Sequence, residues 1–551
     1  MKIRNIFERI ISYGRRHGIK GALRHGCKKA IYYIESKRDH GNYIYKRWMR
    51  HHEPSEEELK EQRNATFSLN PKFSILLLSH HAPKPGLQPL VQSLQAQTYS
   101  NWELCDAYSN AQGDYVVMAD GADSLSVDAL YELAMAIEKE SDIDVLYSDD
   151  DRIDGDVRVQ PHFKSDFNID LLRSTNYIGR FLVVKKSLAD EVGEQRLEFK
   201  EARGYDYIFR CVEKAQKVYH IPKILYHRGY DENSTHIKEN ERLVIEAHLN
   251  RCGINATVIY NERYGVYHTS IGVMGNPMVT IIIPNKDHIE DLNKCLTSIY
   301  EKTTYRNYEI IIVENNSSKQ ETFTYYKELE KQYENINVIV WGNDFNYAAI
   351  NNYAVTHAKG EYVLFLNNDT EVISGNWLEE MLGYCQREDV GVVGARLYYP
   401  DDTIQHAGVI IGFGGVAGHT FLGQGRYESG YFARAMCTQN YSAVTAACMM
   451  TPKKLFENLN GFLEDFRIAF NDIDYCLRVR NEGKLVVYNS QAELYHYESK
   501  SRGLEGTREK AERFKSEIKL FQNKWHTALE KSDPFYNPNL ALDRSDFALK
   551  K

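Results

Sequence analysis

An apolar run that ends abruptly in polar residues is the first place in this 551-residue sequence where we expect chemistry. The stretch Glu361–Glu371 reads EYVLFLNNDTE, so Asn367 and Asp369 follow directly on a predicted buried strand. Ligands of open α/β sheets bind at the carboxyl ends of strands, and carboxylate oxygen suits a hard divalent cation that holds phosphates. A metal-diphosphate site is one interpretation of this stretch, and a polar turn that merely ends the strand is the other.

The elements that must position this stretch occur twice along the chain. From Phe73 the sequence predicts strand, helix and strand in FSILLLS, PLVQSLQAQ and NWELCD, and GDYVVMADGAD from Gly113 is a third strand that ends in acids. From Val279 the same order returns in VTIIIPNKD, LNKCLTSIYEKTTY, NYEIIIVENN and GEYVLFLNNDTE. Self-similarity over such a length indicates two copies of one α/β domain.

The two copies differ where a nucleotide site would need residues. The first copy has a gap between its second and third strands, which removes the counterparts of ENNSSKQETF, of the helix that follows it, and of the continuing stretch through WGNDFNYAAINN (Trp341–Asn352). Counted from the matched third strands, Ala122 stands at the position of Asp369. A later match between ARGYDYIFR and FNDIDYCLR places Gly204 at the position of Asp472. We therefore expect the second copy to carry the chemistry and the first to be degenerate.

Five motifs occur in order in the second copy. They are IIIPNKD and IIIVENNS at two strand ends, NYAAINN at the start of a helix, LNNDTE, and FNDIDYCLRVRNEG. Together they resemble the family 2 glycosyltransferases of the GT-A fold, particularly rhamnosyltransferase-like bacterial enzymes that make surface polysaccharides. LNNDTE stands at the place of the family's DxD motif, with Asn367 where the first Asp is usual, and Asn471 stands where the family often has Glu.

The resemblance implies an α/β chain with two tandem GT-A domains, each Rossmann-like with a mixed central sheet. We expect a basic helical segment and linker at 1–70, a degenerate and inactive GT-A-like domain at 71–270, and the catalytic domain at 277–505. A helical and extended tail is expected at 506–551.

The family also implies an inverting transfer of a sugar from a nucleotide donor. Direct displacement at an anomeric carbon needs a base for the acceptor hydroxyl and a cation for the departing diphosphate. Asp472 matches the family's base position at the start of a predicted helix, whose dipole favours its ionised form. A helix N-cap is the structural alternative for Asp472. Asp474 and Arg478 lie one turn apart on this helix and are predicted to form a supporting ion pair.

The donor site implied by the resemblance uses polar residues at strand ends. Asp369 matches the metal-binding Asp and should join a divalent cation, Mn or Mg, to the β-phosphate. His496 resembles a late family histidine and is a candidate second ligand, since imidazole binds Mn more readily than Mg. The first copy keeps His227 at the matching place, so a structural role for His496 is the alternative. The residues expected to contact the nucleotide are Pro284, Asn285, Glu314, Asn346, Asn351, Asn367 and Asp369, with Glu314 as an acceptor for a pyrimidine N–H.

The glycine-rich stretch 395–450 lies between these motifs, where the family binds its acceptor. His406 and Thr445 are candidates for acceptor contact. We expect His419 to belong to the loop alone.

The net charge of −8 conceals a basic start, because the first 50 residues hold fourteen Lys and Arg against three Asp and Glu. Interleaved with apolar residues, they predict a basic amphipathic helix that either lies on an anionic membrane surface or packs on the body. The nine cysteines form no CxxC pair, so neither a zinc site nor a disulfide framework is expected. Without a signal peptide or an apolar run of spanning length, we expect a cytoplasmic protein that is either soluble or peripheral on the inner face of the plasma membrane, with no nucleic-acid partner.

Two function classes remain from the sequence. The first is a hexosyl- or deoxyhexosyltransferase that takes a UDP- or dTDP-sugar and extends a cell-surface polysaccharide or lipid-linked glycan, with Asp472 as general base. The second is a non-catalytic carbohydrate-binding or scaffold protein of a glycan assembly complex, for which the degenerate first copy is a precedent. The joint presence of Asp369 and Asp472 in the second copy favours the enzyme. A nucleotidyltransferase would need a Gly/Lys-rich phosphate loop, which Pro284–Lys286 does not supply.

Overall fold

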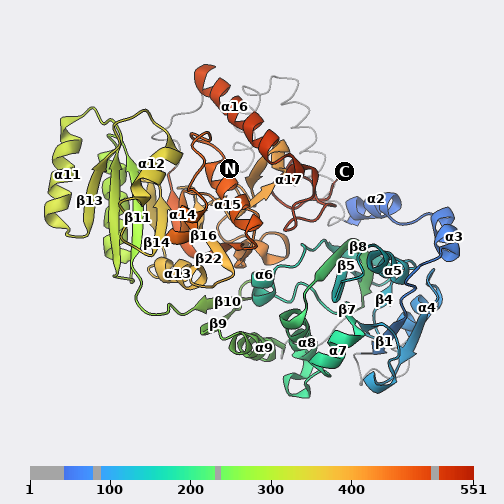
Figure 1. Cartoon of the computed structure of the whole chain (residues 1–551). Helices are drawn as coiled ribbons and strands as arrows, with labels where there is room; N and C mark the ends of the chain where they lie inside the picture. Colours follow the sequence, from blue (N-terminus) through green and yellow to red (C-terminus); the bar gives the residue numbers. More distant parts are fainter. Residues whose placement is uncertain (1–41, 78–87, 230–236, 498–507, 551) are drawn as a thin grey trace.

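Two mixed β-sheets with corresponding strand orders organise the computed structural model, which describes residues 42–77, 88–229, 237–497 and 508–550 (Figure 1). The first sheet consists, in spatial order, of β2 (Trp102–Cys105), β1 (Phe73–Leu77), β3 (Tyr115–Ala119), β7 (Leu182–Lys185), β5 (Val145–Asp154), β8 (Val218–Arg228) and β4 (Ser124–Leu125), and β6 (Val157–His162) pairs with β5. We call this sheet and its helices the first unit.

The second sheet repeats that order and adds one strand at its edge. It consists of β13 (Ile336–Val340), β12 (Tyr308–Glu314), β11 (Val279–Asn285), β14 (Tyr362–Leu366), β21 (Cys448–Pro452), β16 (Val390–Tyr398), β22 (Leu485–His496) and β15 (Thr370–Val372). Two short strands extend it, since β17 (Ile404–His406) pairs with β16 and β20 (Gln439–Asn440) with β22. The added strand, β13, belongs to the segment that the first copy lacks in sequence. The mixed α/β architecture predicted for both copies is confirmed.

Helices cover both faces of the second sheet, because β11, β12 and β14 are apolar on both sides. One face packs against α12 (Tyr347–Val355), α14 (Lys453–Asn458) and α15 (Asn471–Asn481). The other packs against α10 (Ile289–Lys302), α11 (Gln320–Gln332) and α13 (Trp377–Cys385). The loop region after β17 contains the hairpin of β18 (Val409–Ile411) and β19 (Ala417–His419).

The first unit is layered in the same way. One face packs against α4 (Gln88–Gln95) and α5 (Ala129–Lys139). The other packs against α6 (Ile169–Ser174), α7 (Lys186–Val192), α8 (Arg203–Lys214), α9 (Ile237–Arg251) and the hairpin of β9 (Ala256–Asn261) and β10 (Val266–Ile271).

A hydrogen-bonded contact at the start of the third strand is present in both units. In the second unit the N–H of Gly360 donates to Thr280 Oγ1 at 2.9 Å, and that hydroxyl donates to Glu309 at 2.7 Å. In the first unit Gly113 N–H donates to the Ser74 hydroxyl at 2.7 Å, which in turn donates to a glutamate on β2. A Cβ on Gly360 would lie 2.6 Å from Thr280 N, so the close approach of these strands requires glycine.

Buried polar contacts join the two units. Asp170 of α6 pairs with Arg387 at 2.6 Å and accepts a hydrogen bond from Asn440 at 2.7 Å. After α16 (Arg508–Lys524) and α17 (His526–Glu530), the chain continues as largely irregular structure over the predicted tail. Asn537 of this tail donates to Asp149 of the first unit at 2.8 Å. Asp533 of the tail accepts the N–H of Ile411 in the second unit at 2.7 Å, so the tail contacts both units.

The basic N-terminal segment is described only from residue 42. There α2 (Asn42–His52) buries Tyr45 and Trp48 against the first unit, where the Trp48 ring meets Phe163 edge-on. Packing on the body, one of the two predicted alternatives, therefore holds for α2. A capping box formed by Ser55 and Glu58 begins α3 (Glu56–Asn64). Residues 1–41, which carry most of the predicted amphipathic pattern, lie outside the described residues. Within the described residues, no helix combines the length and apolar character needed to cross a bilayer.

Candidate active site

Strand pairing brings the LNNDTE turn next to His496. The turn follows β14, and β15 then runs antiparallel to β22 so that Thr370 lies opposite His496. As a result His496 Nε2 lies 3.2 Å from Asp369 Oδ1, and both side chains are buried. The two residues predicted as metal ligands are therefore in direct contact.

The hydrogen bonds of His496 indicate the state of its ring. Nδ1 lies 2.6 Å from Gln405 Oε1, which can only accept, and Nε2 lies 3.1 Å from the Asn367 amide nitrogen, which can only donate. These two partners place a proton on Nδ1, and Nε2 lies on the side of the Asp369 carboxylate. Two facing electron-pair donors, one nitrogen and one oxygen, fit a divalent cation of the Mn type.

Asp472 lies in the first turn of α15. The N-cap of this helix is Phe470, in a left-handed conformation at φ 65°, so the N-cap alternative for Asp472 is wrong. Asp472 Oδ2 accepts the N–H of Ala446 at 3.0 Å, and Oδ1 accepts that of Ile473 at 2.9 Å. These two bonds orient a half-buried carboxylate at the start of the helix.

The ion pair predicted next to Asp472 is present. Asp474 is fully buried and contacts Arg478 at 2.9 Å. Lys524 at 2.7 Å and the indole N–H of Trp525 at 3.0 Å also reach its carboxylate. Asp474 thereby links α15 to the end of α16.

Tyr347 connects Asp472 to the LNNDTE turn. Its hydroxyl lies 3.1 Å from the carbonyl oxygen of Ala446, whose N–H bonds Asp472, and 3.5 Å from Asn367 Oδ1. Sequence reasoning missed Tyr347, although the signal was available, because NYAAINN belongs to the segment that the first copy lacks.

Two residues expected to contact the nucleotide, Glu314 and Asn285, have hydrogen-bond partners within the protein beneath the site. Glu314 is buried, and its carboxylate accepts from the backbone N–H and hydroxyl of Ser317 and from Tyr326 at 2.8 Å. Asn285 donates to the same tyrosine at 2.8 Å and accepts from Asn368 at 2.6 Å. Glu314 and Asn285 therefore hold the loops around strand ends β11, β12 and β14 together.

The remaining predicted contacts are distributed around α12 and β11. Asn346 is the N-cap of α12, accepting from Ala349 N–H at 3.2 Å. Asn351 is fully buried and donates to the Tyr347 carbonyl at 2.8 Å, while its Oδ1 has no hydrogen-bond partner among the described residues. Pro284 is half-buried in β11. Of the predicted set, Asn367 and Asp369 lie at the His496 contact itself.

The two acceptor candidates differ in position. Thr445 is half-buried and directly precedes Ala446, which bonds Asp472. His406 is fully buried, with Nδ1 3.3 Å from Nδ1 of His419. Burial, together with the neighbouring His419, lowers the pKa of His406 well below its usual range. His406 therefore lies beneath the surface as a neutral ring.

The strand ladders correct the sequence match between the two turns. Ser124 lies opposite His227 in the first unit, as Thr370 lies opposite His496 in the second. The residue just before Ser124 is Asp123, so the predicted match of Ala122 to Asp369 is wrong: the first turn has one extra residue.

The first unit thus keeps the carboxylate at this turn. Asp123 is fully buried, with Arg180 Nη1 3.3 Å from Oδ2 and the Tyr226 hydroxyl donating to the same oxygen at 2.7 Å. A guanidinium of the chain itself therefore balances its charge. Gly204 is the second residue of α8 as Asp472 is of α15, which agrees with the predicted loss of that carboxylate.

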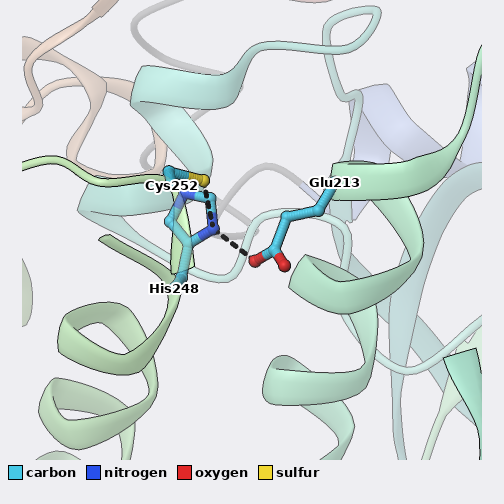
Figure 2. A group of neighbouring side chains, drawn as sticks. All are labelled: Glu213, His248 and Cys252. Carbon is cyan, nitrogen blue, oxygen red and sulfur yellow. Dashed lines mark hydrogen bonds and ion pairs between the residues drawn. The ribbon is translucent and has the colours of Figure 1, made fainter. Parts of the chain in front are cut away.

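A second group of possible metal ligands lies in the first unit, at Glu213, His248 and Cys252, whose ligand atoms are all within 4.8 Å of one another (Figure 2). His248 Nε2 accepts from the Arg173 guanidinium at 3.2 Å, and Nδ1 donates to Glu213 at 2.6 Å. Arg251 also pairs with Glu213 at 2.7 Å. Because the positively charged side chains of Arg173 and Arg251 already lie against His248 and Glu213, these residues form a hydrogen-bonded cluster rather than a metal site.

Acid should weaken the fold through His248. Burial lowers the pKa of this histidine to about 4, whereas an unfolded histidine titrates near about 6.5. The unfolded state therefore takes up the proton first, and the stabilisation present above about pH 6.5 is lost as the pH falls toward about 4. The free energy of unfolding is measured in urea at several pH values across this window. In His248→Gln its slope against pH should be smaller, corresponding to the uptake of about one proton fewer on unfolding. An unchanged slope would contradict the burial argument, and the exposed His51→Gln on α2 is the control for loss of an imidazole.

Comparison with known proteins identifies the family of the second unit. A model described as glycosyl transferase family 2 matches residues 280–459, a stretch that contains Asp369 and ends before Asp472. An uncharacterized protein of Sinorhizobium fredii is 38% identical over 533 residues, 87% of this chain and 58% of that protein. The O-antigen biosynthesis protein RfbC of Myxococcus xanthus is 33% identical over 562 residues, 92% of this chain and 43% of its own.

A shorter relative matches part of the chain. The dTDP-rhamnosyl transferase RfbF of Shigella flexneri is 22% identical over 233 residues, 40% of this chain and 70% of its own. The chain spans about half the length of the two longer relatives. The family match over residues 280–459 makes the second unit of this chain a glycosyltransferase family 2 domain.

Proposed function

We propose that this chain is an inverting, metal-assisted glycosyltransferase that moves a sugar from a nucleotide-sugar donor to a growing cell-surface polysaccharide or lipid-linked glycan. The supporting observation is the arrangement of three side chains in the family 2 unit. Asp369 and His496 are in contact, and Asp472 is connected to the same turn through Ala446 and Tyr347.

In this proposal Asp472 is the general base. One of its carboxylate oxygens takes the proton of the acceptor hydroxyl as that oxygen bonds to the anomeric carbon of the donor. The bond from the anomeric carbon to the phosphate oxygen breaks, and its electron pair leaves with the nucleoside diphosphate. Attack from the face opposite the leaving group inverts the anomeric centre. The amide bonds from Ala446 and Ile473 orient the carboxylate for this transfer.

Asp369 and His496 would hold a divalent cation, Mn or Mg, which supplies positive charge toward a departing diphosphate. Nε2 of His496 and the carboxylate oxygen of Asp369 fit that role. Asn367 contacts both His496 and Tyr347, and we propose that its side chain also contacts the ribose or base of the donor.

The donor and acceptor classes are proposed from the relatives. A UDP- or dTDP-sugar is the proposed donor, and the name of the Shigella flexneri relative favours dTDP and a deoxyhexose. The name of the Myxococcus xanthus relative favours a surface glycan as acceptor. The first unit is proposed to be inactive, because Gly204 replaces the base and Arg180 pairs with its turn carboxylate.

The second candidate function is a non-catalytic scaffold in a glycan assembly complex. The observation that favours it is the buried contact surface between the two units, where Asp170, Arg387 and Asn440 meet. A chain that binds glycan but releases no nucleoside diphosphate from any donor would support the scaffold over the enzyme.

Asp472→Asn should abolish turnover and keep donor binding. The substitution preserves the shape of the side chain but removes the proton acceptor, and loss of a general base typically costs about 10²–10⁴-fold in rate. The donor is first identified by thermal shift with UDP-, dTDP- and GDP-sugars, since a bound ligand stabilises the fold. Release of nucleoside diphosphate from that donor is then measured. Turnover within about threefold of wild type would remove Asp472 as base, and the exposed Asp465→Asn is the matched control.

Asp369→Asn should remove the metal-dependent part of donor binding. The amide keeps the size of the carboxylate but not its charge, so the thermal shift produced by donor with Mn²⁺ should fall to the shift produced by donor alone. Asp120→Asn, at the corresponding turn of the first unit, should leave the Mn²⁺-dependent shift unchanged. If only the Asp120 variant lost the shift, the donor site would lie in the first unit, which would contradict the proposal.

We further propose that the chain is cytoplasmic and reaches the inner face of the membrane through its first 50 residues. In the described part of this segment, α2 directs Lys46, Arg47 and Arg50 to solvent while Tyr45 and Trp48 pack inward. Cosedimentation with vesicles containing anionic lipid should fall when residues 1–41 are deleted, because basic residues near an anionic surface contribute about 1 kcal/mol each. Equal sedimentation of both chains, at low salt, would exclude this attachment.

A further inference from the structure

We propose that Gln405 is a positioning residue that makes His496 a cation ligand by fixing which ring nitrogen carries the proton. The inference rests on the proposed function, in which Asp369 and His496 hold a divalent cation. It adds a residue outside the motifs that the sequence singled out.

Gln405 lies in a β-bulge. In the pairing of β16 with β17, Leu397 lies opposite His406, but the next residue, Tyr398, lies opposite Ile404. Gln405 is therefore the extra residue of β17, between two paired neighbours. A bulge re-aims the side chain of its extra residue, and bulges are frequent beside active sites. Here the re-aimed side chain is 97% buried and ends at His496.

Gln405 and Asn367 independently specify the same form of the ring. The carbonyl oxygen of the Gln405 amide lies 2.6 Å from Nδ1, so Nδ1 carries the proton. The amide nitrogen of Asn367 lies 3.1 Å from Nε2, so Nε2 presents a lone pair. That lone pair is on the side of Asp369, 3.2 Å from its Oδ1. Partners of this kind, on the nitrogen away from a metal, set the orientation and basicity of histidine ligands.

The strand order does not by itself require Gln405. In the first unit the corresponding histidine, His227, has its Nδ1 held by Asp151 of β5, at 2.7 Å. The second unit holds the same nitrogen with a neutral amide from a different strand, β17. The choice of Gln405 is therefore specific to the unit that keeps Asp472.

Without an acceptor at position 405, the imidazole loses the bond that keeps its proton on Nδ1. The proton can then move to Nε2, where it would donate to Asp369 and occupy the lone pair that a cation needs. Gln405→Met removes the acceptor at similar side-chain length. Gln405→Glu keeps an oxygen acceptor in the same place.

Mn²⁺ alone, added to the full chain and followed by electron paramagnetic resonance, tests this role without any turnover. The wild type should bind Mn²⁺ with ¹⁴N coupling from an imidazole in the pulsed spectrum. Gln405→Met should weaken binding about 10–100-fold and lose the coupling, as loss of such a partner does at other metal sites. Gln405→Glu should retain both. Gln439→Met, which removes another buried glutamine whose side chain bonds Arg434, is the matched control and should bind as wild type.

Binding and ¹⁴N coupling that are unchanged in Gln405→Met would overturn the inference. A wild-type chain that binds no Mn²⁺ would instead contradict the cation site of the proposed function. In that case the role of Gln405 is tested by the tautomer of the His496 imidazole, which ¹⁵N spectra of the metal-free, histidine-labelled wild type report. The signal of His496 is assigned by its loss in His496→Gln. A proton on Nδ1 supports the inference, and a proton on Nε2 overturns it even if the Gln405 variants do not fold.

Discussion

The antiparallel pairing of β15 with β22 is the constraint on which the candidate site depends. Only Asn367–Asp369 separate β14 from β15, so the position of the Asp369 carboxylate is set by the strands on either side. Opposite this turn, β22 ends at His496. A register shift of one residue would turn His496 to the other face of the sheet, because side chains alternate along a strand. The contact between the two donors is thus a consequence of sheet register.

Much of the architecture could be predicted because the sequence contains two copies of the same strand and helix pattern. The apolar runs at Phe73 and Val279 both form the first strand of a mixed sheet, each paired in parallel with the next strand along the chain, and the ion pair of Asp474 with Arg478 followed from helical spacing. The match of Ala122 to Asp369 failed for a physical reason. A turn can take up one extra residue between two paired strands, and that residue is visible only when the ladders are compared.

The chemical roles of buried polar residues were harder to predict. A strand-end glutamate such as Glu314 has the same sequence signature whether it faces a ligand or anchors a loop. Its bond to Ser317 depends on the fold of the loop that follows the strand, and its bond to Tyr326 on a helix, α11, that starts after that loop. Gln405 had no signal in the sequence at all, because a bulge arises from the pairing of two strands and leaves no mark on either alone. The sequence shows which residues could take part in chemistry, whereas the tertiary contacts show which of them hold neighbouring loops in place.

The segment that the second unit adds explains why several differences between the units occur together. It supplies the edge strand β13 and the helix α12, and with α12 comes Tyr347, the residue that connects the base position to the LNNDTE turn. A unit without this segment has no such connection to maintain. Loss of the carboxylate at Gly204 in the first unit therefore removes nothing that its remaining structure uses.

The pairing of Asp123 with Arg180 separates the two units in how they respond to their surroundings. A guanidinium that belongs to the chain cannot be diluted, chelated or exchanged for another ion, so the positive charge beside Asp123 in the first unit does not depend on free ions. In the proposed function, Asp369 and His496 of the second unit would hold a divalent cation, so the charge balance of the corresponding turn would depend on the ions in solution. The two copies of this turn would then respond differently to the solvent, because one is balanced by a residue of the chain and the other by an exchangeable ion.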